Sequence, residues 1–170
     1  MDNSSYRGSQ ILLLTLLIIS VCSTSCYDHK SSDVVRSIKS IESPAGMHSS
    51  EPNLHVGNDE KVYLSWVETS EDHNTSLYYS TINHNVWSQK YEISQGGNWF
   101  VNWADFPSMS AFGQGSIASH FLVQRGEDTY AYDVNVSISN DQGMSWSNPI
   151  TPHTDSTLTE HGFVSMVPYK

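Results

Sequence analysis

The chain has 170 residues and carries 8 Lys and Arg against 18 Asp and Glu, which gives a formal charge of −10. Nucleic acid backbones need clustered Lys and Arg, so this charge excludes nucleic acid as an expected partner. Cys22 and Cys26 are the only cysteines, and the eight histidines lack a ligand spacing such as His-x-x-x-His. We therefore expect no disulfide, no metal site and no cofactor.

Residues 11–21 form an apolar run that is too short for a membrane span but typical of the core of an export signal. Small residues at 23–25 then lead into Cys26, a pattern that resembles a bacterial lipobox. The resemblance implies a signal peptide over residues 1–25. It also implies a lipid on Cys26 that anchors the exported protein to a membrane of the bacterial cell envelope, on the periplasmic or cell-surface side. The alternative is an ordinary secretory signal, cleaved near Ser25, that leaves Cys26 free.

Residues 26–50 are rich in Ser and Asp, include Pro44 and Gly46, and have thinly spread apolar side chains. This composition predicts a flexible tether, with one strand entering around residues 34–41. A short amphipathic helix in the same place is the rival interpretation.

From Glu51 onward the sequence repeats. Residues 52–57 lead into an alternating run at 62–67, and residues 107–113 lead likewise into 117–122, so both features recur after 55 positions. Later strands are expected at 77–82 and 134–139. Four short strands per unit predict an all-β protein, with one unit at 51–105, a second at 106–162 and the start of a third at 163–170.

The octet at 139–146 reads Ser-x-Asp-x-Gly-x-x-Trp and follows a predicted strand, which indicates a hairpin turn. Asp141 can accept bonds from the backbone N–H groups of the turn, and Gly143 supplies a positive φ at no steric cost. Ser139 opens the motif, and Trp146 buries its ring on the hairpin. The interval from Ser80 to Trp87 equals that from Ser139 to Trp146, so residues 80–87 are interpreted as a degenerate copy of the motif.

This octet matches the Asp-box, or bacterial neuraminidase repeat, of sialidase-like β-propellers. The resemblance implies a partial propeller of about two four-stranded antiparallel blades plus the first strand of a third. Because propellers close with roughly four to eight blades, it also implies the front part of a longer protein. The alternative is a two-blade protein that assembles with other copies. In the family the box lies away from the substrate pocket, so Asp141 is not a catalytic candidate.

Residues 96–106 combine two glycines with a cluster of aromatic side chains. In a propeller this run enters an inner strand, and such loops line the central pocket in the family that the box resembles. Asp105 is therefore the candidate catalytic carboxyl group, with Trp99, Asn102 and Trp103 as candidate sugar ligands. The alternative is that the tryptophans wedge between blades and Asp105 caps a turn.

Glu160 and His161 occupy the equivalent entry to the next unit, and Arg125 follows the second strand of unit two. These three residues are further candidates for substrate binding. The alternative for the Glu160–His161 pair is a solvated loop.

Sialidases, as a family, hold the sugar carboxylate with three arginines and use a tyrosine backed by a glutamate as nucleophile. After the signal this chain contains only Arg36 and Arg125, and no Tyr/Glu pair can be identified. We therefore expect an exported sialidase-like protein of the glycoside hydrolase or glycan-binding type that is inactive as this chain. The alternative function is a non-catalytic propeller scaffold for protein interaction or assembly at the cell envelope.

Overall fold

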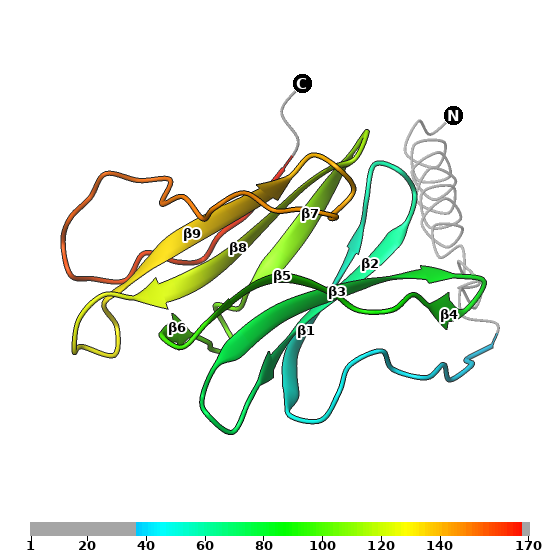
Figure 1. Cartoon of the computed structure of the whole chain (residues 1–170), viewed down its shortest axis with the longest axis horizontal. Coiled ribbons are helices and arrows are strands. Elements are labelled where there is room, and N and C mark those ends of the chain that lie inside the picture. The colour runs from blue at the N-terminus through cyan, green and yellow to red at the C-terminus, as the bar shows by residue number, and fades with distance from the viewer. Residues whose placement is uncertain (1–36, 168–170) are drawn as a thin grey trace, which may run out of the picture. The chain divides into compact units, whose positions relative to one another are not determined.

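The computed structural model describes residues 37–167, and throughout this range the regular structure is β-strand, arranged in two antiparallel sheets (Figure 1). The expected signal peptide, Cys26 and the first part of the tether lie outside the described residues. Residues 37–46 contain no regular structure, and a turn at 47–48 precedes the first strand. Among the described residues no helix is long and apolar enough to span a membrane. The expected all-β class is confirmed.

Sheet 1 is a five-stranded meander in which β1 pairs with β2 and β2 with β3, while β4 and β5 follow each other along the outer edge of β3. A two-residue turn joins β3 to β4, and its residues His84 and Asn85 have φ angles of 48° and 64°, as expected of a tight hairpin. The bounds are β1 (Ser49–Val56), β2 (Val62–Thr69), β3 (Thr75–Asn83), β4 (Val86–Trp87) and β5 (Tyr91–Gly96).

Sheet 2 has four strands, one of which, β8, pairs with all the others. It pairs with β6 and then β7 along one edge and with β9 along the other. The outer edge of β9 makes two isolated bridges, Val136 with Ile150 and Tyr132 with Glu160. The sheet begins at residue 99, inside the range 51–105 expected for the first unit. Its strands are β6 (Trp99–Phe100), β7 (Ser108–Gly113), β8 (Ser116–Gln124) and β9 (Tyr132–Ser139).

The two sheets repeat the same register. Val62 pairs with Ile82 in sheet 1, and Ile117 pairs with Ser139 in sheet 2. Each residue of β8 therefore lies 55 positions after its counterpart in β2, and each residue of β9 lies 57 positions after its counterpart in β3. The extra two residues are in the loop between β8 and β9. The predicted strands at 62–67, 77–82, 117–122 and 134–139 are confirmed.

The sheets also stack in the same sense. Val67 and Leu77 face sheet 2 in the main core, whereas their counterparts Leu122 and Val134 lie in a second cluster on the far face of sheet 2. The face of sheet 1 that carries Val67 and Leu77 points toward sheet 2, whereas the equivalent face of sheet 2 points away from sheet 1. The two sheets are therefore stacked in the same orientation, with unlike faces in contact. The main core is the layer between the sheets, built from Tyr63, Val67, Leu77, Tyr79, Ile93, Met109, Ala111, Ile117 and Phe121.

The turn at 139–146 has the hydrogen bonds that its sequence predicts. One carboxylate oxygen of Asp141 accepts from the Ser145 backbone N–H at 2.9 Å and from the Ser139 hydroxyl at 2.7 Å, and the other accepts from the Ser145 hydroxyl. Ser139 Oγ accepts in turn from the Gly143 N–H at 2.8 Å. Gly143 has a φ of 83°, as the turn requires. Trp146 packs against the main core, and its indole nitrogen has no hydrogen-bond partner among residues 37–167.

The expected second copy of this motif at residues 80–87 is wrong. Ser80 pairs with Leu64, whereas Ser139 pairs with Ile117, so the register makes Ile82 the counterpart of Ser139. An equal spacing between serine and tryptophan concealed a turn that is two residues shorter.

The tryptophans themselves do correspond. The residue after each of them, Ser88 after Trp87 and Ser147 after Trp146, donates its backbone N–H to a carbonyl of the preceding strand at 2.8 Å. Each of these serines also accepts a backbone N–H from that strand through its hydroxyl oxygen, at 3.2 Å and 3.0 Å respectively. Trp-Ser is therefore the element of the turn that both sheets share.

Asp141→Asn is expected to lower the thermal unfolding midpoint at pH 7, because the amide keeps one acceptor oxygen where the carboxylate uses two. The hydrogen bonds from Ser145, joined by that from Ser139, lower the pKa of Asp141 from 3.8 to about 2 in the folded protein. A depressed folded pKa adds stability that is fully present above pH 4 and is lost as the pH falls toward 2. Melting curves of both proteins should therefore converge between pH 4 and pH 2.

Asp72→Asn, an exposed loop substitution, should leave the midpoint at pH 7 unchanged. A gap between wild type and Asp141→Asn that is as wide at pH 2.5 as at pH 7 would show that the carboxylate charge is not what stabilises the turn.

Candidate functional site

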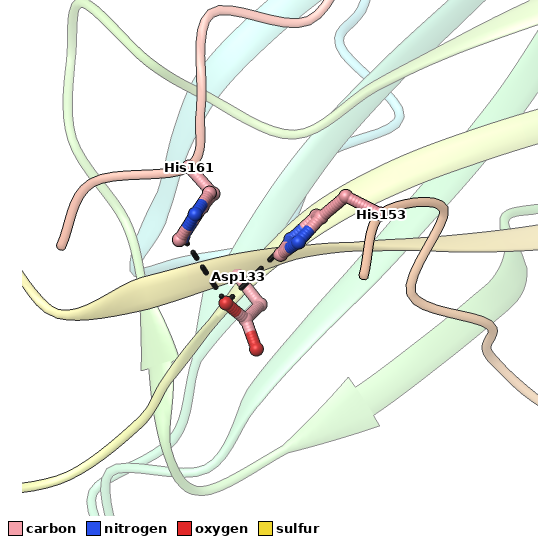
Figure 2. A group of neighbouring side chains, drawn as sticks. All are labelled: Asp133, His153 and His161. Atoms are coloured by element: carbon pink, nitrogen blue, oxygen red, sulfur yellow. Dashed lines mark ion pairs between the residues drawn. The ribbon is translucent and has the colours of Figure 1, made fainter. Parts of the chain in front are cut away.

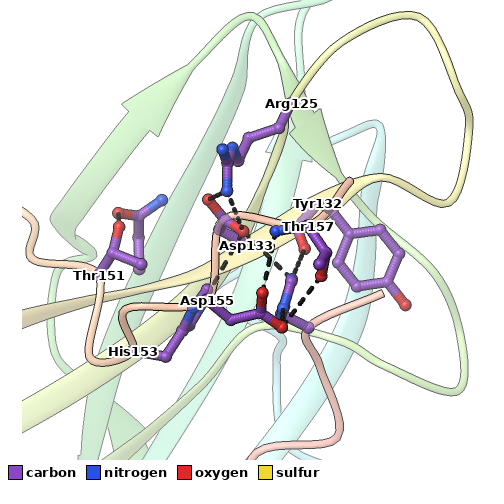
Figure 3. Close-up of polar contacts among 9 residues, drawn as sticks. Arg125, Tyr132, Asp133, Thr151, His153, Asp155 and Thr157 are labelled. Carbon is purple, nitrogen blue, oxygen red and sulfur yellow. Dashed lines mark hydrogen bonds and ion pairs between the residues drawn. The ribbon is translucent and has the colours of Figure 1, made fainter. Parts of the chain in front are cut away.

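The loop end of sheet 2, where β8 passes into β9, gathers charged side chains from three segments. Arg125 follows β8, Asp133 lies near the start of β9, and their side chains meet across the hairpin (Figure 3). One guanidinium nitrogen of Arg125 lies 3.0 Å and 3.3 Å from the two carboxylate oxygens of Asp133. The structure thus pairs Arg125, expected to bind substrate, with a carboxylate of the protein itself.

The segment that follows the Ile150 bridge and continues just past the Glu160 bridge brings His153 and His161 to this carboxylate. His161 Nδ1 lies 3.2 Å from Asp133 Oδ1, and His153 Nε2 lies 3.6 Å from the same oxygen (Figure 2). The two imidazole rings stack with centroids 4.2 Å apart and an interplanar angle of 16°. One potential ligand atom from each of the three residues lies within 4.8 Å of the others.

Asp155 fixes the orientation of His161 from the opposite side. Its carboxylate accepts from the Thr157 backbone N–H at 2.9 Å and lies 3.1 Å from His161 Nε2. The bonds from Thr157, together with that from His161, lower the pKa of Asp155 to about 2, so it is ionised at neutral pH. The hydrogen bond to Asp155 is the main cause that raises the pKa of His161.

His153 has no such support. Both of its ring nitrogens are shielded from solvent and lack a hydrogen-bond partner among the described residues. At 3.6 Å, the contact with Asp133 is too long for a hydrogen bond. Buried polar atoms in folded proteins normally have partners, so an orphaned imidazole beside a carboxylate is a feature that needs an explanation.

Spacing rules do not predict this cluster, because His153 and His161 are eight positions apart in an irregular loop, and Asp133 comes from a strand. Spacing rules describe ligands that lie on one regular element. The density of His, Asp and Glu between residues 153 and 161 was the one available signal.

Asp105, the expected catalytic carboxyl group, is buried and only 5 % exposed. Its oxygens accept a hydrogen bond from the Phe163 backbone N–H at 2.8 Å and from the Tyr132 hydroxyl at 3.3 Å. Gly162 packs directly over the carboxylate, and a Cβ at that position would overlap it. Asp105 therefore holds the segment after residue 160 against sheet 2.

Tyr132 is closed to the solvent in the same way. Its side chain stacks on Phe100 with ring centroids 4.2 Å apart. Burial, with the carboxylates of Asp105 and Glu160 nearby, raises the pKa of Tyr132 to about 12, so the phenol stays protonated at neutral pH. A buried, protonated phenol is poorly suited to act as a nucleophile.

The remaining candidates are spread over different surroundings. Trp99 stacks on Phe121 with ring centroids 4.2 Å apart and packs against the main core. Asn102 accepts the Ala104 N–H through its side-chain oxygen at 2.8 Å, which closes a local turn. Trp103 is 81 % exposed, and Glu160 is exposed beside its bridge to Tyr132. Of the expected ligands, the structure brings together only Arg125 and His161, which meet at Asp133.

Comparison with known proteins adds no assignment: no family model, curated protein or solved structure matches this chain. The fold and the site define an all-β protein of two repeated antiparallel sheets, with a His–Asp–Arg cluster at one loop end.

Proposed function

We propose that this chain is an exported, lipid-anchored protein of the sialidase-like propeller class, that its two sheets are adjacent blades, and that it binds glycans. Support for the class comes from the Asp-box turn, whose Ser139, Asp141 and Gly143 make the bonds that the motif predicts. The shared register and the same-sense stacking of the sheets are what successive blades require. The lipid anchor at Cys26 rests on the sequence alone.

Trp103 is the observation that carries glycan binding. A tryptophan is rarely left in water, yet this ring is 81 % exposed at the tip of the loop between β6 and β7. Asp105, two residues after Trp103, is buried and accepts a hydrogen bond from the Phe163 N–H. This contact anchors the loop that carries the ring. A flat aromatic face of this kind can stack on the apolar face of a sugar ring.

Trp103→Ala is expected to weaken glycan binding at least about 10-fold, which corresponds to about 1.4 kcal/mol of lost stacking. The measurement is binding of the purified 170-residue chain to a panel of immobilised sialylated and neutral oligosaccharides. Met144→Ala is the matched control, because Met144 is also 81 % exposed but lies in the Asp-box turn. Equal binding by Trp103→Ala and wild type would remove glycan binding from this loop.

No glycosidase turnover is expected from this chain. Arg125 forms an ion pair with Asp133. Asp105 and Tyr132 are both buried, and they are hydrogen-bonded to each other. A clamp for a sugar carboxylate needs free guanidinium groups with the right geometry. A fluorogenic sialoside should therefore stay intact, and hydrolysis that disappears in Asp105→Asn would contradict this expectation.

One observation favours the alternative, a non-catalytic scaffold for protein contacts. Leu54 and Val56 lie on the edge strand β1, and each is 66 % exposed. Apolar side chains on an open sheet edge are typical of surfaces that dock another chain. If the scaffold function is the correct one, Leu54→Asp with Val56→Asp would abolish partner binding, and Trp103→Ala would have no effect on it.

A further inference from the structure

The cluster of Asp133, His153 and His161 has the dimensions of a zinc site. Ligands that lie 2.0–2.1 Å from a tetrahedral zinc ion are separated from one another by about 3.3 Å. Asp133 Oδ1 lies 3.2 Å from His161 Nδ1 and 3.6 Å from His153 Nε2 (Figure 2). Because the two rings are stacked, His153 has to rotate out of the stack to aim Nε2 at the same point as His161 Nδ1, and this rotation completes three corners of such a tetrahedron.

The hydrogen-bond directions around His161 leave a place for a cation. Its Nε2 faces the carboxylate of Asp155, while its Nδ1 faces Asp133 Oδ1 at 3.2 Å and the Tyr132 carbonyl at 3.3 Å. Asp155 accepts the N–H on Nε2 of His161, so a cation binds at Nδ1 in place of a proton. The lone pair of Nδ1 then points at acceptor oxygens, an arrangement that a metal ion between them makes favourable.

The partners of His161 and Asp133 are of the kind found around metal ligands. Metal-bound histidines usually donate their other N–H to a carboxylate, which is what His161 does toward Asp155. Arg125 holds the Asp133 carboxylate, with one nitrogen 3.0 Å from Oδ2 and 3.3 Å from Oδ1, while Oδ1 also faces the histidines. Two carboxylates against one guanidinium leave the cluster with one net negative charge while the imidazoles are neutral, which attracts a divalent cation.

We propose that Asp133 Oδ1, His161 Nδ1 and His153 Nε2 bind a divalent transition-metal ion, with Zn²⁺ as the best fit. Two imidazoles and a carboxylate suit zinc better than calcium or magnesium, which prefer oxygen ligands alone. Three protein ligands leave the fourth position to water. The ion ties the loop around residues 151–161 to β9, and it gives the orphaned Nε2 of His153 a partner.

The test is a calorimetric titration of Zn²⁺ into the purified 170-residue chain, prepared without a polyhistidine tag. We expect one ion per chain. His153→Phe keeps the ring stacked on His161 and removes both nitrogens, neither of which makes a hydrogen bond in the described structure. It should weaken Zn²⁺ binding at least ~100-fold, and Asp155→Asn should weaken it about 10-fold or more.

His73→Asn is the matched control. His73 is an exposed loop histidine with a φ of 59°, a conformation that asparagine tolerates, so this variant loses one imidazole away from the cluster. It should bind Zn²⁺ like the wild type. Zn²⁺ should also slow proteolysis within residues 151–161 in the wild type and in His73→Asn, but not in His153→Phe.

Titration with Co²⁺ reports the ligand type. Visible bands of a tetrahedral nitrogen and oxygen site support the proposal. A strong near-ultraviolet thiolate band would place the ion on Cys22 or Cys26 and overturn it, as would equal affinity of wild type and His153→Phe, or no Zn²⁺ binding at all. The proposal does not depend on glycan binding, because Trp103→Ala leaves all three ligands in place and should retain Zn²⁺.

Discussion

Gly143→Ala should lower the free energy of unfolding by about 3 kcal/mol, the sum of strain at a positive φ and of a steric overlap. Gly143 has a φ of 83°, and an added Cβ would overlap the Tyr79 hydroxyl and lie 2.8 Å from its ring carbon Cζ. Tyr79 cannot move aside easily, since it is 3 % exposed and stacks on Tyr91. Urea denaturation followed by tryptophan fluorescence measures the change.

Gly126→Ala separates the two causes. Gly126 also has a positive φ, 106°, but a Cβ there would meet no atom within 4 Å. This variant should lose only about 1 kcal/mol, the backbone strain alone. Equal losses at the two glycines would mean that Tyr79 and the turn separate without cost, and that the Asp-box turn does not hold sheet 2 to sheet 1.

Phe121→Ala should cost about 4 kcal/mol, the usual range for a buried phenylalanine in a tight core. Phe121 is 2 % exposed in the layer between the sheets, and its ring stacks on Trp99. Loss of the ring leaves a cavity where the two sheets meet, so we expect them still to unfold in one transition at a lower denaturant midpoint.

Phe163→Ala makes the same substitution at a residue that is 72 % exposed, and it should stay within about 0.5 kcal/mol of the wild type. Two separate transitions in Phe121→Ala, or a loss no greater than that of Phe163→Ala, would show that the sheets do not share one core.

The strands and the turn at 139–146 were predictable because their signals are local. Alternating side chains mark the strand at residues 62–67, and the Asp141 and Gly143 positions carry the chemistry that the turn needs. The interval of 55 positions reflected real register between the sheets.

The copy expected at residues 80–87 failed for an instructive reason. Hairpin turns can lose two residues without disturbing the strands that they join, so equal spacing in the sequence is no guarantee of equivalent positions. The hydrogen-bond ladder, which fixes Ile82 opposite Val62, decides the alignment.

The site was harder to predict, since burial and partners are tertiary properties. Asp105 and Trp103 are two positions apart, yet one is 5 % and the other 81 % exposed. Likewise, His161 was a candidate by its acidic neighbour Glu160, whereas its actual partners are Asp133 and Asp155. A loop that leaves a strand edge and returns to it brings such groups together without any sequence period.

The same-sense stacking of the sheets gives the molecule a polarity. One face of the stack carries the exposed side chains of β1, including Leu54 and Val56, whereas on the opposite face the cluster around Leu122 and Val134 is buried, with Val164 packed against it. A contact between two copies through these unlike faces would be heterologous, and a heterologous contact adds subunits in one direction. The contact that joins the two sheets within one chain, between β1 and β2 of sheet 1 and β7 of sheet 2, already brings two unlike faces together.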